Sequence, residues 1–108
     1  MKLSALVLVI STYTVTDGDT LKASDIGIRL WGIDAPEMSE TGGAAAKRGL
    51  SQLTGREQLT CNVKDTDRYG RIVARCYLPD GRDLACELIK SGHAEVWVKY
   101  SRGAYQRC

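Results

Sequence analysis

The sequence has little of what several common classes of protein require. It contains one histidine, and its four cysteines form no Cys-x-x-Cys pair, which argues against a zinc site. Its longest apolar stretch, close to the N-terminus, is far too short to span a bilayer, so we expect no stable insertion into a membrane. It has no internal repeat, low-complexity run or linker. The 108 residues therefore fit a single domain, 1–108.

A large excess of charge is also missing, since the formal net charge is only +2. Composition alone therefore does not indicate a nucleic-acid-binding protein. Charge placement says more, because Lys99, Arg102 and Arg107 lie near the C-terminus with Tyr100 and Tyr105 among them. Basic residues interleaved with tyrosines can hold a phosphate backbone and stack on bases. A solvated basic face is the alternative, and both interpretations stay open.

The pattern of apolar residues and turn formers predicts mainly strands with two helices. The five expected strands are rich in β-branched residues or alternate apolar with polar residues, and they span residues 7–16, 20–23, 27–33, 58–64 and 71–78. The expected helices cover 44–53 and 84–91. Gly55 is a stop signal for the first helix, and Asp83 is an N-cap for the second.

The first ten residues allow two interpretations. Met1 and Lys2 followed by an apolar run resemble the start of a signal peptide, although no small-x-small cleavage site follows. The same residues also suit a first buried strand. Residues 1–10 are therefore either a signal-peptide remnant or a strand.

The four cysteines predict two disulfides. Cys61 and Cys76 lie on the two arms of the expected hairpin, where cross-strand side chains approach within bonding distance. Cys86 begins the second helix and Cys108 is the last residue, so a second bridge would fix the C-terminal end. Disulfides imply a secreted or periplasmic protein, whereas four free thiols in a reducing cytoplasm are the alternative.

Three short charged motifs carry the chemical information. They are Asp-Gly-Asp-Thr at 17–20, Arg-Leu-Trp-Gly-Ile-Asp-Ala-Pro-Glu at 29–37, and Asp-Arg-Tyr-Gly-Arg at 67–71. Their carboxylates suit a hard cation, and their guanidiniums pair with phosphate oxygens in a bidentate manner. Hydrolysis of a phosphodiester needs such groups, together with a base that takes a proton from water.

At these motifs the chain resembles the staphylococcal nuclease (thermonuclease) family, from about Tyr13 to Tyr105. The resemblance implies an α+β fold that is mostly β, namely a five-stranded OB-type Greek-key barrel with two helices. Family members generally continue with a third, C-terminal helix, which we expect to be absent from this chain. The resemblance also implies Ca²⁺-dependent hydrolysis of DNA and RNA.

The resemblance assigns a role to each central residue. Asp19, Asp34 and the backbone carbonyl of Ala35 would bind Ca²⁺. Arg29 and Arg71 would stabilise the phosphate in the transition state.

Glu37 would act as general base toward water, with orientation of the water or tuning of the loop as alternatives. Arg68, Tyr69 and Tyr100 would bind the nucleotide beside the scissile bond, although Val98 stands where the family has a second tyrosine. The two tryptophans, 31 and 97, are expected in the core.

The motifs together with the resemblance predict a monomeric, Ca²⁺-dependent nuclease of low sequence specificity, and the resemblance implies that it leaves 3′-phosphate ends. Contacts to phosphates carry no base identity, which accounts for the low specificity. The alternative is a barrel without catalysis that serves as a nucleic-acid-binding or protein-binding module. Five central positions distinguish the two, and all five are present: Asp19, Arg29, Asp34, Glu37 and Arg71.

Overall fold

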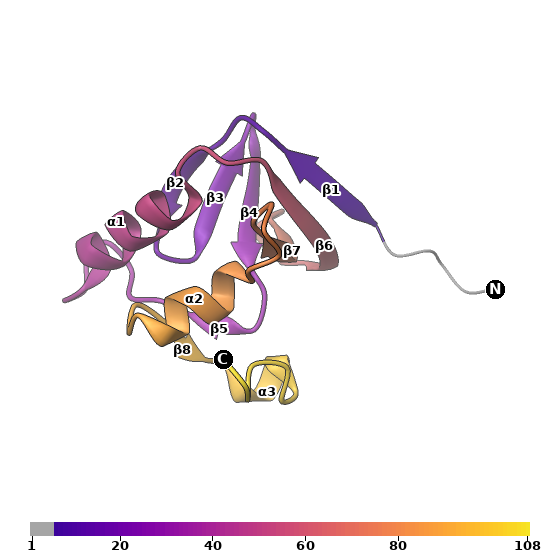
Figure 1. Ribbon diagram of the computed structural model, residues 1–108. Helices are drawn as coiled ribbons and strands as arrows, with labels where there is room; N and C mark the ends of the chain where they lie inside the picture. Colours follow the sequence, from indigo (N-terminus) through magenta and orange to yellow (C-terminus); the bar gives the residue numbers. More distant parts are fainter. Residues whose placement is uncertain (1–5) are drawn as a thin grey trace.

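The computed structural model describes residues 6–108, which fold around a curled six-stranded sheet (Figure 1). The order of its strands is β1-β6-β7-β4-β3-β2. Their bounds are β1 Val7–Ile10, β2 Thr14–Asp17, β3 Thr20–Ala23, β4 Ile26–Leu30, β6 Leu59–Thr66 and β7 Ile72–Tyr77. All neighbouring strands are antiparallel except β4 and β7, which run parallel. A second, two-stranded sheet joins β5 (Ile33–Asp34) to β8 (Glu95–Val96).

Three helices complete the fold: the two that the sequence predicts, and a third, short helix that it does not. They are α1 (Gly43–Thr54), α2 (Leu84–Lys90) and the four-residue α3 (Val98–Ser101). The Asp83 carboxylate caps α2 by accepting hydrogen bonds from the amides of Ala85 (2.9 Å) and Cys86 (3.4 Å). At the end of α1, Gly55 takes the left-handed conformation that a C-terminal glycine permits. The predicted α+β fold is confirmed.

The first expected strand is in fact two strands at opposite edges of the sheet. β1 pairs with β6, whereas β2 pairs with β3, and residues 11–13 carry the chain between them. Only part of the predicted segment 1–10 lies within the described residues: Val7–Ile10 is a strand, while residues 1–5 lie outside them.

The expected strand 27–33 also divides, because Gly32 adopts a φ of 78° and turns the chain after β4. This turn starts the separate β5–β8 sheet, whose two strands pair Ile33 with Val96 and Asp34 with Glu95. The turn therefore places Asp34 beyond the end of β4, opposite Glu95 of the C-terminal part of the chain.

The hydrophobic core lies between the inner face of the sheet and helices α1 and α2. It is built mainly of aliphatic side chains that are completely or almost completely buried, including Leu21, Ile28, Leu30, Leu50, Leu59, Leu84 and Leu88. Each such side chain contributes about 1.5–3 kcal/mol by leaving water. No helix within residues 6–108 is long and apolar enough to cross a membrane.

Both predicted disulfides are present. Cys61 and Cys76 stand directly opposite each other on β6 and β7, with their Cα atoms 4.0 Å apart, and they are part of the core. Cys86 and Cys108 join the first turn of α2 to the C-terminal residue. The second bridge therefore ties the segment that follows α3 back to the body of the fold.

Candidate active site

Residues from separate segments converge on Arg29, whose side chain projects from β4. Its Nη2 lies 3.5 Å from Asp19 Oδ2 and 3.5 Å from Asp34 Oδ1. Its Nη1 donates to the backbone carbonyls of Leu30 and Ile33, both at 3.0 Å. The guanidinium is therefore held in place by the backbone while it lies between two carboxylates.

Asp19 is the buried member of this cluster, with 7% of its surface exposed. Its carboxylate accepts hydrogen bonds from the Ala35 amide (2.9 Å) and the Thr20 hydroxyl (3.0 Å). Burial raises the pKa of Asp19 to about 6, against the lowering effects of the Ala35 amide and Arg29. The Asp17 carboxylate raises this pKa further. The charged form of Asp19 therefore lacks full compensation from the protein, and a nearby cation would favour it.

The donors around Asp19 suit a hard cation such as Ca²⁺. Ca²⁺ takes six to eight oxygen ligands, from carboxylates, carbonyls and water. The carboxylates of Asp19 and Asp34 converge on one nitrogen of Arg29, and the Ala35 amide donates a hydrogen bond to the Asp19 carboxylate. Within residues 6–108, no three or more His, Cys, Asp or Glu side chains form a metal-binding cluster. A bound Ca²⁺ would therefore need backbone carbonyls and water in addition to the two aspartates.

Glu37 lies in the exposed segment that leads from β5 to α1. Its amide donates to Glu40 Oε1 (2.7 Å), and its carbonyl accepts from the Glu40 amide (2.9 Å). The first residue of α1 must be glycine here, because a Cβ on Gly43 would clash with the Glu37 carbonyl. Among the described residues, the Glu37 carboxylate itself forms no hydrogen bond or ion pair. The structure thus brings Asp19, Arg29 and Asp34 together but leaves Glu37 facing solvent.

Arg71 is oriented by the turn between β6 and β7. Asp67 Oδ2 accepts from Arg71 Nε at 2.6 Å, and Asp67 Oδ1 accepts from the amides of Tyr69 and Arg71, both at 3.0 Å. The stem of Arg71 crosses β4 at Gly27, where an added Cβ would lie 2.9 Å from Arg71 Cγ. The absence of a side chain at Gly27 is therefore what lets Arg71 lie against β4.

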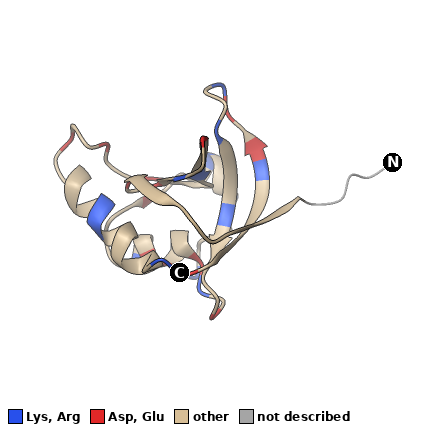
Figure 2. Cartoon of the chain, turned by 90° about the horizontal axis from the view of Figure 1, so that it is seen from above, with Lys and Arg blue, Asp and Glu red and all other residues tan. Residues whose placement is uncertain are grey.

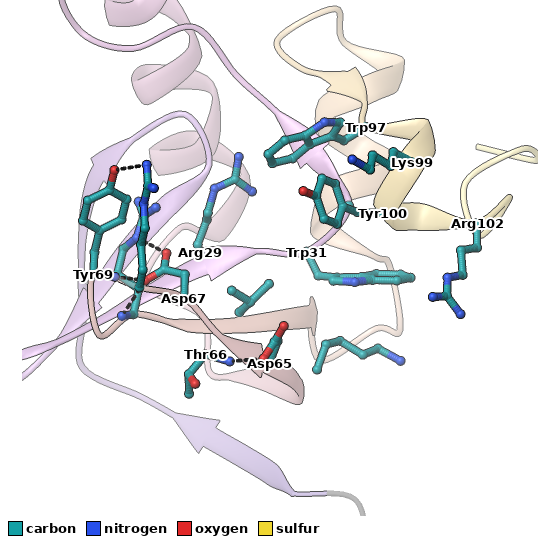
Figure 3. Close-up of a pocket in the computed structure, with 15 residues that line it drawn as sticks. Arg29, Trp31, Asp65, Thr66, Asp67, Tyr69, Trp97, Lys99, Tyr100 and Arg102 are labelled. Atoms are coloured by element: carbon teal, nitrogen blue, oxygen red, sulfur yellow. Dashed lines mark hydrogen bonds and ion pairs between the residues drawn. The ribbon is translucent and has the colours of Figure 1, made fainter.

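A groove of about 650 Å³ connects Arg29 and Arg71 with aromatic residues of the C-terminal segment (Figure 3). Six of its described lining residues are basic and two are acidic. The basic residues are Arg29, Lys64, Arg68, Arg71, Lys99 and Arg102, and the acidic ones are Asp65 and Asp67. Four aromatic rings also line it: Trp31, Tyr69, Trp97 and Tyr100.

The aromatic residues at the two ends of the groove contact its arginines. Tyr69 is 69% exposed, its hydroxyl accepts from Arg68 Nη2 (2.9 Å), and the Cζ of Arg71 lies 5.5 Å from its ring centroid. Trp97 packs edge-on against Tyr100 with the ring centroids 4.3 Å apart, and the Cζ of Arg29 lies 5.2 Å from the Trp97 ring. Arg68, Tyr69 and Tyr100 thus line one groove with Arg29 and Arg71.

Sequence reasoning missed Trp97. It was expected in the core, but it is 42% exposed and lies over Arg29 in the groove. Its neighbours Lys99 and Tyr100 gave a usable signal, because a tryptophan next to basic and tyrosine residues suits a nucleic-acid surface as well as a core. Trp31 is half-buried and also lines the groove, so the core expectation is only partly met. Val98, which replaces a family tyrosine, is 73% exposed.

Comparison with known proteins adds a family match. A family model described as staphylococcal nuclease homologue matches residues 27–108. An uncharacterized endonuclease of Escherichia coli is 34% identical over 91 residues, covering 81% of this chain and 60% of that protein. A micrococcal nuclease of Shigella flexneri is 38% identical over 69 residues, covering 60% of this chain and 40% of that protein.

A relative with a different description also matches. The succinoglycan biosynthesis protein ExoI of Rhizobium meliloti is 32% identical over 110 residues, covering 90% of this chain and 56% of that protein. The chain spans 60% or less of the length of each of these three relatives.

Proposed function

The chain belongs to the staphylococcal nuclease family, and from this premise we propose that it is a Ca²⁺-dependent nuclease that hydrolyses phosphodiester bonds of DNA and RNA. The observation that carries the proposal is the convergence of Asp19 and Asp34 on one nitrogen of Arg29, beside a groove lined by Arg71. Arg29 and Asp34 belong to one motif, and Asp19 joins them from the motif that precedes it.

Each residue of the candidate active site has a defined part in the proposed reaction. Asp19, Asp34 and the Ala35 carbonyl would hold Ca²⁺, which when bound polarises a phosphoryl oxygen. Arg29 and Arg71 stabilise negative charge that develops on the phosphate oxygens in the transition state. Glu37 accepts a proton from the attacking water, whose oxygen forms a new bond to phosphorus. The P–O5′ bond breaks, the leaving oxygen takes a proton from solvent, and a 3′-phosphate end remains.

Substrate binding is assigned to the groove. Arg68 pairs with a phosphate, and Tyr69 and Tyr100 contact the nucleotide beside the scissile bond. These contacts address the backbone and the faces of the bases rather than base edges, so we propose low sequence specificity. We also propose a monomeric, secreted or periplasmic protein, a location supported by the two disulfides.

The first test is cleavage of supercoiled plasmid and of single-stranded RNA with Ca²⁺, with Mg²⁺ and with chelator. We expect degradation with Ca²⁺ and none with chelator. Removal of a general base typically costs about 10²–10⁴-fold in rate, so Glu37→Gln is expected to lose most turnover yet retain DNA binding in a gel-shift assay. Glu57→Gln is the matched control, because Glu57 lies outside the groove and outside the cluster around Arg29.

Each alternative outcome has a definite meaning. Unchanged turnover in Glu37→Gln rejects the role of that residue as base. A folded wild-type protein that cleaves nothing under any metal rejects the nuclease and favours the non-catalytic binding module.

A further inference from the structure

The groove extends beyond the residues assigned to cleavage. Figure 3 shows Trp31 and Arg102 at the end opposite Tyr69, with Arg29 lying between the two ends. Lys64 also lines the groove and lies at the Trp31 end, because its Nζ is 5.0 Å from the Trp31 ring centroid. Trp31 follows β4, Lys64 belongs to β6, and Arg102 follows α3. None of these three residues takes part in the proposed hydrolysis.

Trp31 is rigidly placed. Its amide donates to the Ala74 carbonyl (2.9 Å), and its carbonyl accepts from the Tyr105 hydroxyl (2.6 Å). The Tyr105 ring packs against the indole at a centroid distance of 5.8 Å. A fixed, half-buried indole in a basic groove is the kind of surface on which unpaired bases stack.

Two kinds of cation lie near Trp31: Arg75, whose Cζ is 6.0 Å from the ring centroid, is paired with Asp83, whereas the groove-lining cations at this end have no acidic partner within residues 6–108. Among residues 6–108, no ion pair involves Lys64, Lys99 or Arg102. Asp65 is the one acidic residue at this end, and its Oδ1 accepts from the Thr66 amide at 2.8 Å. Lys64 Nζ lies 5.0 Å from the Trp31 ring centroid, on an exposed and flexible stem. It can therefore move to a phosphate when a base takes its place on the ring.

Arg102 stands at a backbone position that favours a small residue. This residue ends α3 in the left-handed conformation with a φ of 50°, and its amide donates to the Val98 carbonyl. Glycine or asparagine is favoured at such a position, because a larger side chain is strained there. Ser24 and Arg56 have a similar φ outside the groove, so the conformation alone indicates no role. Arg102 is distinguished because it lines the groove and forms no ion pair within residues 6–108.

We propose that Trp31, Lys64 and Arg102 form a second nucleotide-binding subsite for single-stranded nucleic acid. An unpaired base stacks on Trp31, and the phosphates on either side of it pair with Lys64 and Arg102. This proposal rests on the proposed nuclease function and specifies its substrate as a strand longer than the nucleotides at the scissile bond. A duplex is excluded from the subsite, because a base reaches the indole face only when it is unstacked.

The test measures binding of fluorescent oligothymidylates of two and of eight nucleotides by anisotropy, in the presence of chelator so that binding is separated from cleavage. The variants are Trp31→Leu, Lys64→Ala and Arg102→Gly, with Arg48→Ala on the exposed face of α1 as control. Loss of one base-stacking contact corresponds to about a tenfold change, so Trp31→Leu should lower the affinity ratio of the long to the short oligomer about tenfold. Trp31→Phe should restore most of that ratio.

Arg102→Gly separates binding from stability. Glycine removes the strain at φ 50°, so this variant should resist urea at least as well as the wild type while binding the long oligomer less tightly. Lys64 and Arg102 are exposed, so their replacement should not prevent folding, and their variants test the subsite if Trp31→Leu fails to fold. An unchanged affinity ratio in the folded variants overturns the proposal, as does a duplex that binds equally well and with the same dependence on Trp31.

The experiments distinguish failure of the subsite proposal from failure of the proposed nuclease function. Wild-type protein that cleaves with Ca²⁺ but whose affinity ratio ignores all three variants lacks the subsite. Protein that binds the long oligomer through Trp31, but never cleaves it, has the subsite without the nuclease function.

Discussion

At the scale of single residues, Asp67 holds both the turn that carries Tyr69 and the side chain of Arg71. One carboxylate accepts from the Tyr69 amide, the Arg71 amide and Arg71 Nε. Tyr69 and Arg71 therefore cannot take independent orientations while Asp67 is charged. Asp67 contacts no reacting group in the proposed mechanism and is a positioning residue.

Replacement of Asp67 by asparagine is expected to lower kcat about tenfold, because it removes the charge-assisted hydrogen bond that orients Arg71. A tenfold loss of rate corresponds to about 1.4 kcal/mol of transition-state stabilisation. Asp80→Asn is a closely matched control. Asp80 binds the amide and Nε of Arg82 in the same way, in a turn that does not line the groove. Steady-state kinetics on single-stranded DNA and urea denaturation should show similar stability changes but different kcat. Equal kcat values in the two variants would remove the positioning role.

The pH dependence of stability tests whether the Asp67–Arg71 ion pair causes the effect of Asp67→Asn on stability. Burial alone would raise the pKa of Asp67, but hydrogen bonds from Arg71 and Tyr69 lower it overall. The charged pair therefore stabilises the folded chain above the carboxyl's unfolded pKa, and this contribution is lost as the pH falls through the lowered folded pKa. The difference in unfolding midpoint between wild type and Asp67→Asn should accordingly shrink in that acidic range and be constant near neutrality.

The sequence predicted that Asp19 and Asp34 would lie close together, but it did not predict that the two tryptophans line the groove. Asp19, Arg29 and Asp34 stand in motifs whose order and spacing carry the resemblance, and the structure brings these three together. Trp97 stands on a short segment where no periodicity shows which face is buried, so composition favoured the core. Its exposure is set by the packing of Tyr100 and Arg29, contacts that no local pattern encodes.

At the scale of elements, the weakest part of the groove wall is α3. A helix of four residues has no stability of its own, because nucleation is costly and few hydrogen bonds repay it. Its position depends on long-range contacts: the Trp97 amide donates to the Gly32 carbonyl, Tyr105 binds Trp31, and Cys108 is bridged to Cys86. Lys99, Tyr100 and Arg102, which line the groove, come from this segment.

Removal of the second disulfide by the double change Cys86→Ser and Cys108→Ser is expected to lower the free energy of unfolding by about 3 kcal/mol, because the bridge closes a loop of intermediate length. It should also weaken binding of single-stranded oligonucleotide, since the groove wall loses its anchor. Replacing Cys61 and Cys76 by alanine is the control, because that bridge joins two strands already paired in the core. Denaturation and anisotropy should show loss of stability in both variants and loss of affinity under native conditions in the first alone. Unchanged affinity in the first variant would mean that α3 is held without the bridge.

The elements show which features local sequence determines. Two helix ends were predictable from local sequence. The Asp83 carboxylate accepts hydrogen bonds from the free amides at the start of α2, and Gly55 adopts the left-handed conformation that ends α1. The division between β1 and β2 was not predictable, because residues 11–13 contain neither glycine nor proline to mark a break. The parallel pairing of β4 with β7 joins segments about forty residues apart. Only the whole fold determines that contact.

At the scale of the whole molecule, the net charge of +2 conceals a strong separation of charge. Some basic residues outside the groove have acidic partners, as in the pairs Arg75–Asp83, Arg82–Asp80 and Lys90–Glu87. Within the groove, Arg29 and Arg71 are also paired with aspartates, but the other four basic lining residues form no ion pair within residues 6–108. Figure 2 shows basic positions on both strands of the β6–β7 hairpin and at its tip. A polyanion therefore meets a much more positive surface than the net charge indicates.

The salt dependence of binding should follow the groove and not the net charge. For single strands, the slope of log K against log salt is about 0.7 for each phosphate that the protein neutralises. Arg68→Ala should therefore reduce the slope by about 0.7, because Arg68 lines the groove and has no ion pair within residues 6–108. Arg82→Ala changes the net charge equally but removes a cation already paired with Asp80 and Glu87, so its slope should match the wild type. Anisotropy titrations in chelator at several salt concentrations measure both, and equal slopes for the two variants would show that net charge, not the groove, governs binding.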